Sequence, residues 1–295
     1  MKARGAMAVA GFRVLAVLAV ALCWTAAVRG GEAEESAAVK AARTLIDKHK
    51  DAVVEVRLVL KTKVSMGGRE GGSQEQKVEV NGTVIDPSGL TVISNTATDP
   101  MSRFSFAGMG GEDNPQFKME TSVTDVKIVL ADGKEYPAKV VLRDKDLDLA
   151  FVRPDEQGLK LSCLEMKAPP AAPKVLDEVV GLARLDRAAN REPAVAVGRI
   201  MSVITKPRTH YVAMTLMESG CPAFDAAGNV LGLSLMRISG AKEGGGFSMM
   251  GMMPSILPCA DILEAAGQVP APGKEAKPAG GEKPAEGGKT DPKAN

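Results

Sequence analysis

The chain has 295 residues, of which 45% are hydrophobic, so it is long enough to bury one or two sizeable cores. Its 37 lysine and arginine residues balance 36 aspartate and glutamate residues, and this balance gives no indication of a nucleic-acid partner. Aromatic residues make up only 3% while methionines number 15, so aliphatic side chains and methionine must fill the core, which is compatible with a β-rich fold.

The first 30 residues have the features of a secretory signal peptide. Lys2, Arg4 and Arg13 give a positive start, an uncharged apolar run follows over 14–28, and small residues come after it. A membrane anchor is the alternative, but the run is shorter than the roughly 20 apolar residues that a spanning helix needs. We therefore expect a secreted or periplasmic protein that has no membrane span once residues 1–30 are removed.

The cysteines and histidines do not predict a metal site. Cys163, Cys221 and Cys259 remain after the signal, an odd number without CxxC spacing, and the only histidines are His49 and His210. We therefore expect no disulfide framework, no zinc site and no cofactor.

After the signal, the chain reads as one helix followed by strands and turns. Apolar residues recur at a helical spacing over 32–50, and the run from Ala52 to Leu60 alternates as a strand does. Glycine, serine and charged residues predict loops at 65–76 and 99–122. The triplet Asn81-Gly82-Thr83 matches a glycosylation acceptor, although such a short pattern often arises by chance. The strands expected in this half are 78–80, 83–85, 90–97, 125–130 and 136–142.

The second half of the chain repeats this pattern of strands. We expect strands at 174–182, 194–204, 209–217 and 229–236, and a closing helix over 254–267. Residues 269–295 contain mainly proline, glycine, lysine, glutamate and alanine without apolar periodicity, so they cannot offset the entropy cost of ordering. We expect them to form a disordered tail.

Two stretches of the sequence stand out: residues 130–152 read LADGKEYPAKVVLRDKDLDLAFV, and residues 218–224 read ESGCPAF. The first is similar to the phrase that carries the triad aspartate of trypsin-like serine proteases, in particular of their HtrA/DegP-type branch, and the second resembles the nucleophile loop of that family. The resemblance covers roughly 41–267. It implies an all-β fold of two six-stranded antiparallel β-barrels, at about 41–165 and 172–268, with a short N-terminal and a C-terminal helix. One trypsin-like domain is therefore expected over 31–268, without the PDZ domain that HtrA proteins usually carry.

The resemblance also assigns positions to the catalytic groups. Ser219 matches the nucleophile and Asp148 the carboxylate that orients the base, while the position of the base holds Thr96. A threonine hydroxyl does not accept a proton near neutral pH, and loss of the histidine from such a triad lowers turnover by about a millionfold. The oxyanion hole would use the backbone N–H groups of Met217 and Ser219, and Met217 stands where the family has a conformationally tolerant glycine.

Three other routes to catalysis are open in principle. His210, nine positions before Ser219, could serve as the base. Cys221 could replace the serine as the nucleophile, and Asp148 could act on Ser219 through a water molecule. Each group also has a simpler interpretation: a solvent-facing strand histidine, a small buried thiol, and a carboxylate held by backbone N–H groups.

A methionine cluster follows the stretch Gly244–Ser248, which resembles one wall of the family's substrate pocket. Methionine suits copper(I), but it also fills irregular gaps and lines adaptable peptide grooves, and we favour the second interpretation. Phe247, Ser248 and Met249 are therefore candidate peptide-binding residues. The cluster consists of Met249, Met250, Met252 and Met253.

These patterns together predict a secreted, catalytically inactive protease homologue of HtrA type. We expect it to bind extended polypeptide by strand addition, or to act as a scaffold in the cell envelope. One alternative is an active serine endopeptidase with a non-standard catalytic centre, and another is a methionine-rich, copper-binding envelope protein. The oligomeric state is left open.

Overall fold

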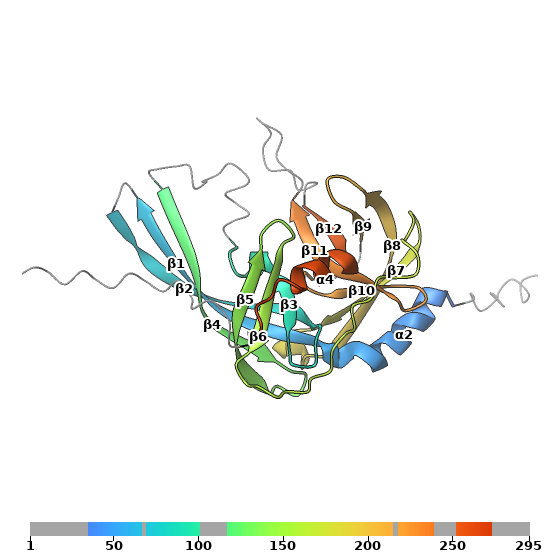
Figure 1. The fold of residues 1–295 in the computed structure, drawn as a ribbon, viewed down its shortest axis with the longest axis horizontal. Coiled ribbons are helices and arrows are strands. Elements are labelled where there is room, and N and C mark those ends of the chain that lie inside the picture. The colour runs from blue at the N-terminus through green and yellow to red at the C-terminus, as the bar shows by residue number, and fades with distance from the viewer. Residues whose placement is uncertain (1–34, 67–68, 101–116, 215–217, 239–251, 273–295) are drawn as a thin grey trace, which may run out of the picture.

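The alternating strands close into two antiparallel β-barrels of six strands each, which lie side by side in the computed structural model (Figure 1). The structure describes residues 35–66, 69–100, 117–214, 218–238 and 252–272. The predicted signal peptide and most of the predicted tail lie outside these residues. The strand order is β1-β2-β3-β6-β5-β4 in the first barrel and β10-β11-β12-β9-β8-β7 in the second. The predicted fold class is confirmed.

The strands of each barrel follow one another in the sequence. Those of the first barrel are β1 (Val53–Met66), β2 (Arg69–Val84), β3 (Thr91–Ser94), β4 (Phe117–Val129), β5 (Glu135–Asp144) and β6 (Leu149–Pro154). Those of the second barrel are β7 (Glu178–Arg184), β8 (Pro193–Ile204), β9 (His210–Ala213), β10 (Pro222–Asp225), β11 (Val230–Ile238) and β12 (Met252–Pro258).

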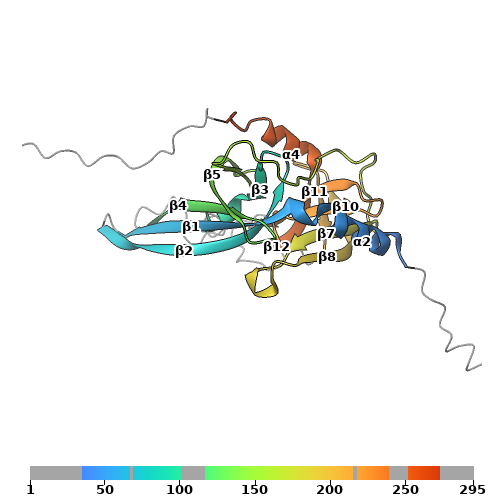
Figure 2. The ribbon, with the colours of Figure 1, turned by 90° about the horizontal axis from the view of Figure 1, so that it is seen from below.

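Helix α2 (Ala37–His49) precedes the first barrel in sequence but packs on the second. The Ser36 hydroxyl caps its N-terminus by accepting a hydrogen bond from Val39 N at 3.3 Å. The short 3-10 helix η1 (Lys50–Ala52) then leads the chain into β1 of the other barrel. The buried face of α2 lies beside β7 and β8 (Figure 2) and consists of Ala38, Ala42 and Leu45.

Three strands continue beyond the first barrel as a long antiparallel ribbon. β1 extends to Met66, β2 begins at Arg69 and β4 begins at Phe117, and together they project away from the body of the protein (Figure 1). The prediction of a loop at 65–76 is therefore wrong, and so is the end of the loop predicted at 99–122, because β2 begins at Arg69 and β4 at Phe117. Backbone hydrogen bonds pair these residues irrespective of side chain, and opposite charges meet across the strands, as at Lys61 and Glu75.

The C-terminal helix is shorter than the sequence predicted. Residues 252–258 form β12, and helix α4 (Cys259–Ala266) begins only after Pro258. The residue before a proline is disfavoured in the helical conformation, so Pro254 and Pro258 keep Met253 and Leu257 extended. No helix in the described part of the chain is long and apolar enough to cross a membrane.

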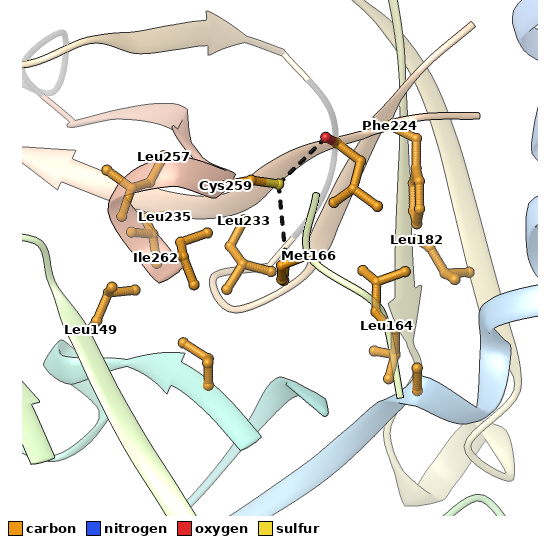
Figure 3. Close-up of a cluster of buried hydrophobic side chains, with 14 of the residues drawn as sticks. Leu149, Leu164, Met166, Leu182, Phe224, Leu233, Leu235, Leu257, Cys259 and Ile262 are labelled. Atoms are coloured by element: carbon orange, nitrogen blue, oxygen red, sulfur yellow. Dashed lines mark hydrogen bonds between the residues drawn. The ribbon is translucent and has the colours of Figure 1, made fainter. Parts of the chain in front are cut away.

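The largest apolar cluster joins the two barrels. It includes Leu149 of β6 in the first barrel, Leu182 and Leu233 of the second barrel, and Leu164 of the connecting segment (Figure 3). The Cys259 thiol lies within the cluster, 3.4 Å from Val230 O, and burial raises its pKa to about 11. A shared core of this kind couples the positions of the two barrels.

A buried arginine also spans the junction between the barrels. Arg184, at the end of β7, is only 4% exposed, and its guanidinium donates hydrogen bonds to three backbone carbonyl groups. Nε donates to Val53 O at 2.5 Å, Nη1 to Arg191 O at 2.6 Å, and Nη2 to Lys50 O. Arg184 thereby ties η1 and β1 to the second barrel.

His49 gives the stability of the protein a pH dependence. Its ring stacks on the fully buried Phe224 of β10, with centroids 5.5 Å apart, and desolvation, aided by the charge of Lys48, lowers the pKa of His49 below 6.5. Below pH 6.5, His49 is protonated more readily in the unfolded chain than in the folded protein. The free energy of unfolding therefore decreases as the pH falls through the folded-state pKa of His49. Well above pH 6.5 the imidazole is neutral in both the folded and the unfolded state, so His49 adds no pH dependence to the free energy of unfolding.

We expect His49→Phe, which keeps the stack but cannot titrate, to lose less stability than the wild type between pH 7.5 and pH 5.5. Urea unfolding at both pH values measures this difference. Equal losses in the two proteins would show that His49 does not titrate differently in the folded and unfolded states.

Candidate active site

The two residues predicted to stand at the positions of the triad acid and the base, Asp148 and Thr96, lie next to each other in the first barrel. Asp148 precedes β6 with a φ of 57°, and Thr96 lies in the 3-10 helix η2 (Asn95–Ala97) that follows β3. Because Ser94 pairs with Leu149 across β3 and β6, the residues that follow Ser94 lie beside Asp148. Asn95 N donates to Asp148 O at 2.9 Å and closes the turn.

The Asp148 carboxylate holds three hydrogen bonds from this segment. Oδ1 accepts from Thr96 N and from Thr96 Oγ1, both at 2.8 Å, and Oδ2 accepts from Ser94 Oγ at 2.6 Å. The threonine hydroxyl therefore donates a hydrogen bond to the carboxylate. It occupies a position next to Asp148 but cannot take up a proton from a serine near neutral pH.

The loop of residues 218–221, which carries Ser219, lies between the two barrels. Gly220 has a φ of +88°, and a Cβ there would lie 2.4 Å from Asn81 O of β2, so only glycine fits. Thr83 Oγ1 donates to Gly220 O at 2.7 Å, and Gly220 N donates to Ser234 O of β11 at 2.8 Å. The loop is thus held from both sides.

Asn81 links this loop to the barrel junction. Its Nδ2 donates to Arg184 O at 3.0 Å and to Glu218 Oε2 at 2.7 Å, while its Oδ1 accepts from Arg184 N at 2.8 Å. Asn81 is buried and its amide is fully engaged. The glycosylation pattern at Asn81-Gly82-Thr83 therefore does not mark an accessible acceptor.

The Ser219 hydroxyl is held by the second barrel and not by a base. Ser219 Oγ accepts a hydrogen bond from Met236 N of β11 at 3.1 Å. Within the described ranges this is the only hydrogen bond that the hydroxyl makes. His49 stacks on Phe224, and His210 lies at the start of β9 opposite Ile204, so neither histidine is bonded to Ser219.

Cys221 does not offer a replacement nucleophile. Its thiol is fully buried, and desolvation, followed by the nearby charge of Glu218, raises the pKa of Cys221 far above its usual value. A buried thiol with a raised pKa is unreactive, because the thiolate is the nucleophile.

Several predicted site residues lie outside the described residues. These are Met217 of the predicted oxyanion hole and Phe247, Ser248 and Met249 of the predicted pocket wall. Met250 lies outside them as well, and only the backbone of Met252 and Met253 is described. The oxyanion hole, the pocket wall and the copper site therefore stay predictions.

The sequence comparisons identify the family of this fold and site. Residues 81–233, more than half of the chain, match the model of the trypsin-like peptidase domain. The chain belongs to this family. The match includes Thr96, Asp148 and Ser219, so all three residues predicted for the triad positions lie inside the family domain. A comparison with curated proteins found no match.

Solved structures resemble the chain at low sequence identity. One is a structure of the HtrA-type protease AlgW, a serine-to-alanine variant with a tripeptide. It is 15% identical, with a TM-score of 0.49 over 77% of this chain. The chain spans 62% of the length of that protein chain.

The structure adds two groups to the site that sequence reasoning missed. Ser94 supplies a hydrogen bond to Asp148, and its hydroxyl two residues before Thr96 was the only signal in the sequence that could have indicated it. Met236 N holds Ser219, and no sequence signal marks it, because a backbone amide is present at almost every residue. Among the described residues, the site holds a carboxylate and a serine in place, and the Ser219 hydroxyl is bonded to a backbone amide and to no side-chain base.

Proposed function

We propose that this protein is a trypsin-like domain that does not hydrolyse peptides and instead binds extended polypeptide segments. The hydrogen bonding of Thr96 and Ser219 carries the proposal. Thr96 donates to Asp148 at the position where a base is required, and Ser219 accepts from Met236 N instead of donating to a base. A serine hydroxyl without a base is a poor nucleophile.

The pairing of β11 supports the polypeptide-binding part of the proposal. β12 pairs with β11 from Gly232 to Ile238, whereas β10 pairs with its opposite edge only as far as Leu233. A strand edge offers backbone N–H and C=O groups to an added polypeptide strand. Ser219 lies beside this edge, because its Oγ accepts a hydrogen bond from Met236 N.

The cellular location is part of the same proposal and depends on the N-terminal sequence. The positive start and the apolar run over 14–28 favour export of the protein. Extended polypeptide segments outside the cytoplasm are then the expected partners.

Labelling with a fluorophosphonate probe tests the loss of catalysis. We expect the wild-type protein to be labelled no faster than Ser219→Ala, because Ser219 has no base to remove its proton. Trypsin serves as the positive control, and cleavage of reduced, carboxymethylated α-lactalbumin is followed in parallel. Labelling or cleavage that disappears in Ser219→Ala would overturn the proposal and favour an active endopeptidase with a non-standard centre.

A further inference from the structure

The projecting ribbon has a strand edge that faces solvent. The ribbon consists of the outer parts of β1, β2 and β4, with β1 in the middle and β2 along one side (Figure 2). The other edge of β2 pairs with β3 only at Thr83 and Val84. Among the described residues, 73–80 form no further backbone hydrogen bond, and residues 71–77 are all exposed. The outer edge of β2 can therefore accept an added strand.

Two features that commonly keep a strand edge from pairing are missing from residues 73–79. The segment reads SQEQKVE, so it has no proline, and its register with β1 continues without a bulge. Its charges alternate in sign, as Glu75, Lys77 and Glu79. These charges do not repel every added strand, but they restrict which strand can pair and in which register.

A second copy of the same segment meets this charge requirement. Opposite residues of an antiparallel pair lie on the same face of the sheet, so a twofold axis between two copies of one strand must pass beside a single residue. With the axis at Gln76, Glu75 lies opposite Lys77 of the second copy, and Lys77 lies opposite its Glu75. An axis at Glu75 or at Lys77 would instead place like charges opposite each other, which is destabilising.

The charges within each ribbon fit the same arrangement. Lys61 of β1 lies opposite Glu75 in the same copy. In the pair, Glu75 would therefore lie between two lysines, Lys61 of its own copy and Lys77 of the second copy. The carboxylate is thus compensated on both sides.

The body of the protein limits the length of the paired segment. Asn81 is buried and bonded to Glu218, so the edge of β2 is covered beyond Glu79. In the register centred on Gln76, the second copy places Gly71 and Gly72 there, which have no side chains to meet the barrels. Pairing from Ser73 to Glu79 is therefore compatible with the fold.

We propose that the protein forms a homodimer in which the β2 edges of two copies pair antiparallel about Gln76. The two ribbons then form one continuous sheet with the strand order β4-β1-β2-β2-β1-β4. The paired segment is short, so the interface is small and the dimer dissociates reversibly. This proposal does not depend on polypeptide binding near Ser219.

Charge reversal tests the pairing. Each new lysine in Glu75→Lys faces Lys77 of the other copy, and each new glutamate in Lys77→Glu faces Glu75. Because two attractive pairs become repulsive, we expect the dimer Kd to rise at least about 10-fold in each variant. An equimolar mixture of the two variants restores opposite charges in every pair and should dimerise about as tightly as the wild type. Sedimentation equilibrium of the full-length proteins measures each Kd.

Lys61→Glu is the matched control for charge reversal. It also places like charges between β1 and β2, opposite Glu75, but leaves Glu75 and Lys77 available to the second copy. This variant should dimerise about as tightly as the wild type. A wild type that stays monomeric at about 100 µM, where even weak interfaces form, would overturn the proposal and favour a strand of another protein as the occupant. A dimer that persists in Glu75→Lys and Lys77→Glu, or that is lost equally in Lys61→Glu, would also overturn it.

Gln76→Cys tests the register of the pair. Opposite Cα atoms of antiparallel strands lie about 4.5–5.5 Å apart, a separation that a disulfide can span. We expect mild oxidation to join Gln76→Cys into a covalent dimer. Gln74→Cys would lie opposite Val78 of the second copy and should form no more covalent dimer than the wild type, whose own cysteines give the background. Equal cross-linking of the two variants would contradict an axis at Gln76.

Discussion

Replacement of Gly232 by alanine should lower the free energy of unfolding by about 4 kcal/mol, because core overpacking costs about 1–3 kcal/mol and a left-handed backbone about 1–2 kcal/mol more. Gly232 has a φ of +155°, and a Cβ there would lie 1.7 Å from Leu257 O and 2.7 Å from Leu257 C. These are backbone atoms of β12, which can move only if the β11–β12 pairing breaks. Urea unfolding measures the loss.

Gly228→Ala is the matched control in the same hairpin. Its φ is +87°, but a Cβ would meet only Leu45 Cδ2, at an ordinary contact distance of 3.8 Å. This variant therefore carries the backbone strain without the clash and should lose about 1 kcal/mol. Equal losses in the two variants would contradict the close approach of β12 to Gly232.

Replacement of Arg184 by methionine has the second largest expected effect, a loss of about 3 kcal/mol, because a hydrogen bond from a charged group contributes about 1.5–3 kcal/mol and the one to Val53 O is buried. Met keeps much of the apolar volume of the side chain but leaves Val53 O, Arg191 O and Lys50 O without their donor. Relief of the buried charge, whose desolvation lowers the pKa of Arg184, offsets part of the loss. Urea unfolding again provides the measurement.

Arg199→Met tests whether the effect belongs to the buried site. The Arg199 side chain is 60% exposed and forms an ion pair with Glu178 at 3.6 Å. Exposed pairs contribute about 0–1 kcal/mol, so this variant should be close to the wild type. If Arg184→Met is no less stable than Arg199→Met, then Arg184 does not hold the barrels together.

The barrel strands could be predicted because their side chains alternate between core and surface. This alternation, with turn signals such as Asp132-Gly133, gave β5 and the end of β4 close to their observed places. The projecting ribbon could not be predicted in this way. Neither face of its outer end is buried in a barrel, so its strands lack an apolar pattern, and their pairing depends on backbone hydrogen bonds that every sequence offers.

The candidate site was predictable where it depends on residue type. Thr96 at the base position is visible in the sequence, and with two histidines in the whole chain few replacements were conceivable. The hydrogen bonds that Thr96 and Ser219 form could not be predicted from the sequence. Thr96 lies 52 positions from Asp148, and its hydroxyl donates because the pairing of β3 with β6 brings it to the carboxylate.

The sequence by itself determined the family, the barrel architecture and the lack of a histidine beside Asp148, since these depend on local patterns and on residue identity. Only the tertiary structure decided how the remaining groups are bonded. Asn81 meets Arg184 across 103 positions, and Ser219 meets Met236 N across 17. A hydrogen bond requires two atoms to come within about 3 Å, and for residues this far apart the closed barrels and their junction set that distance.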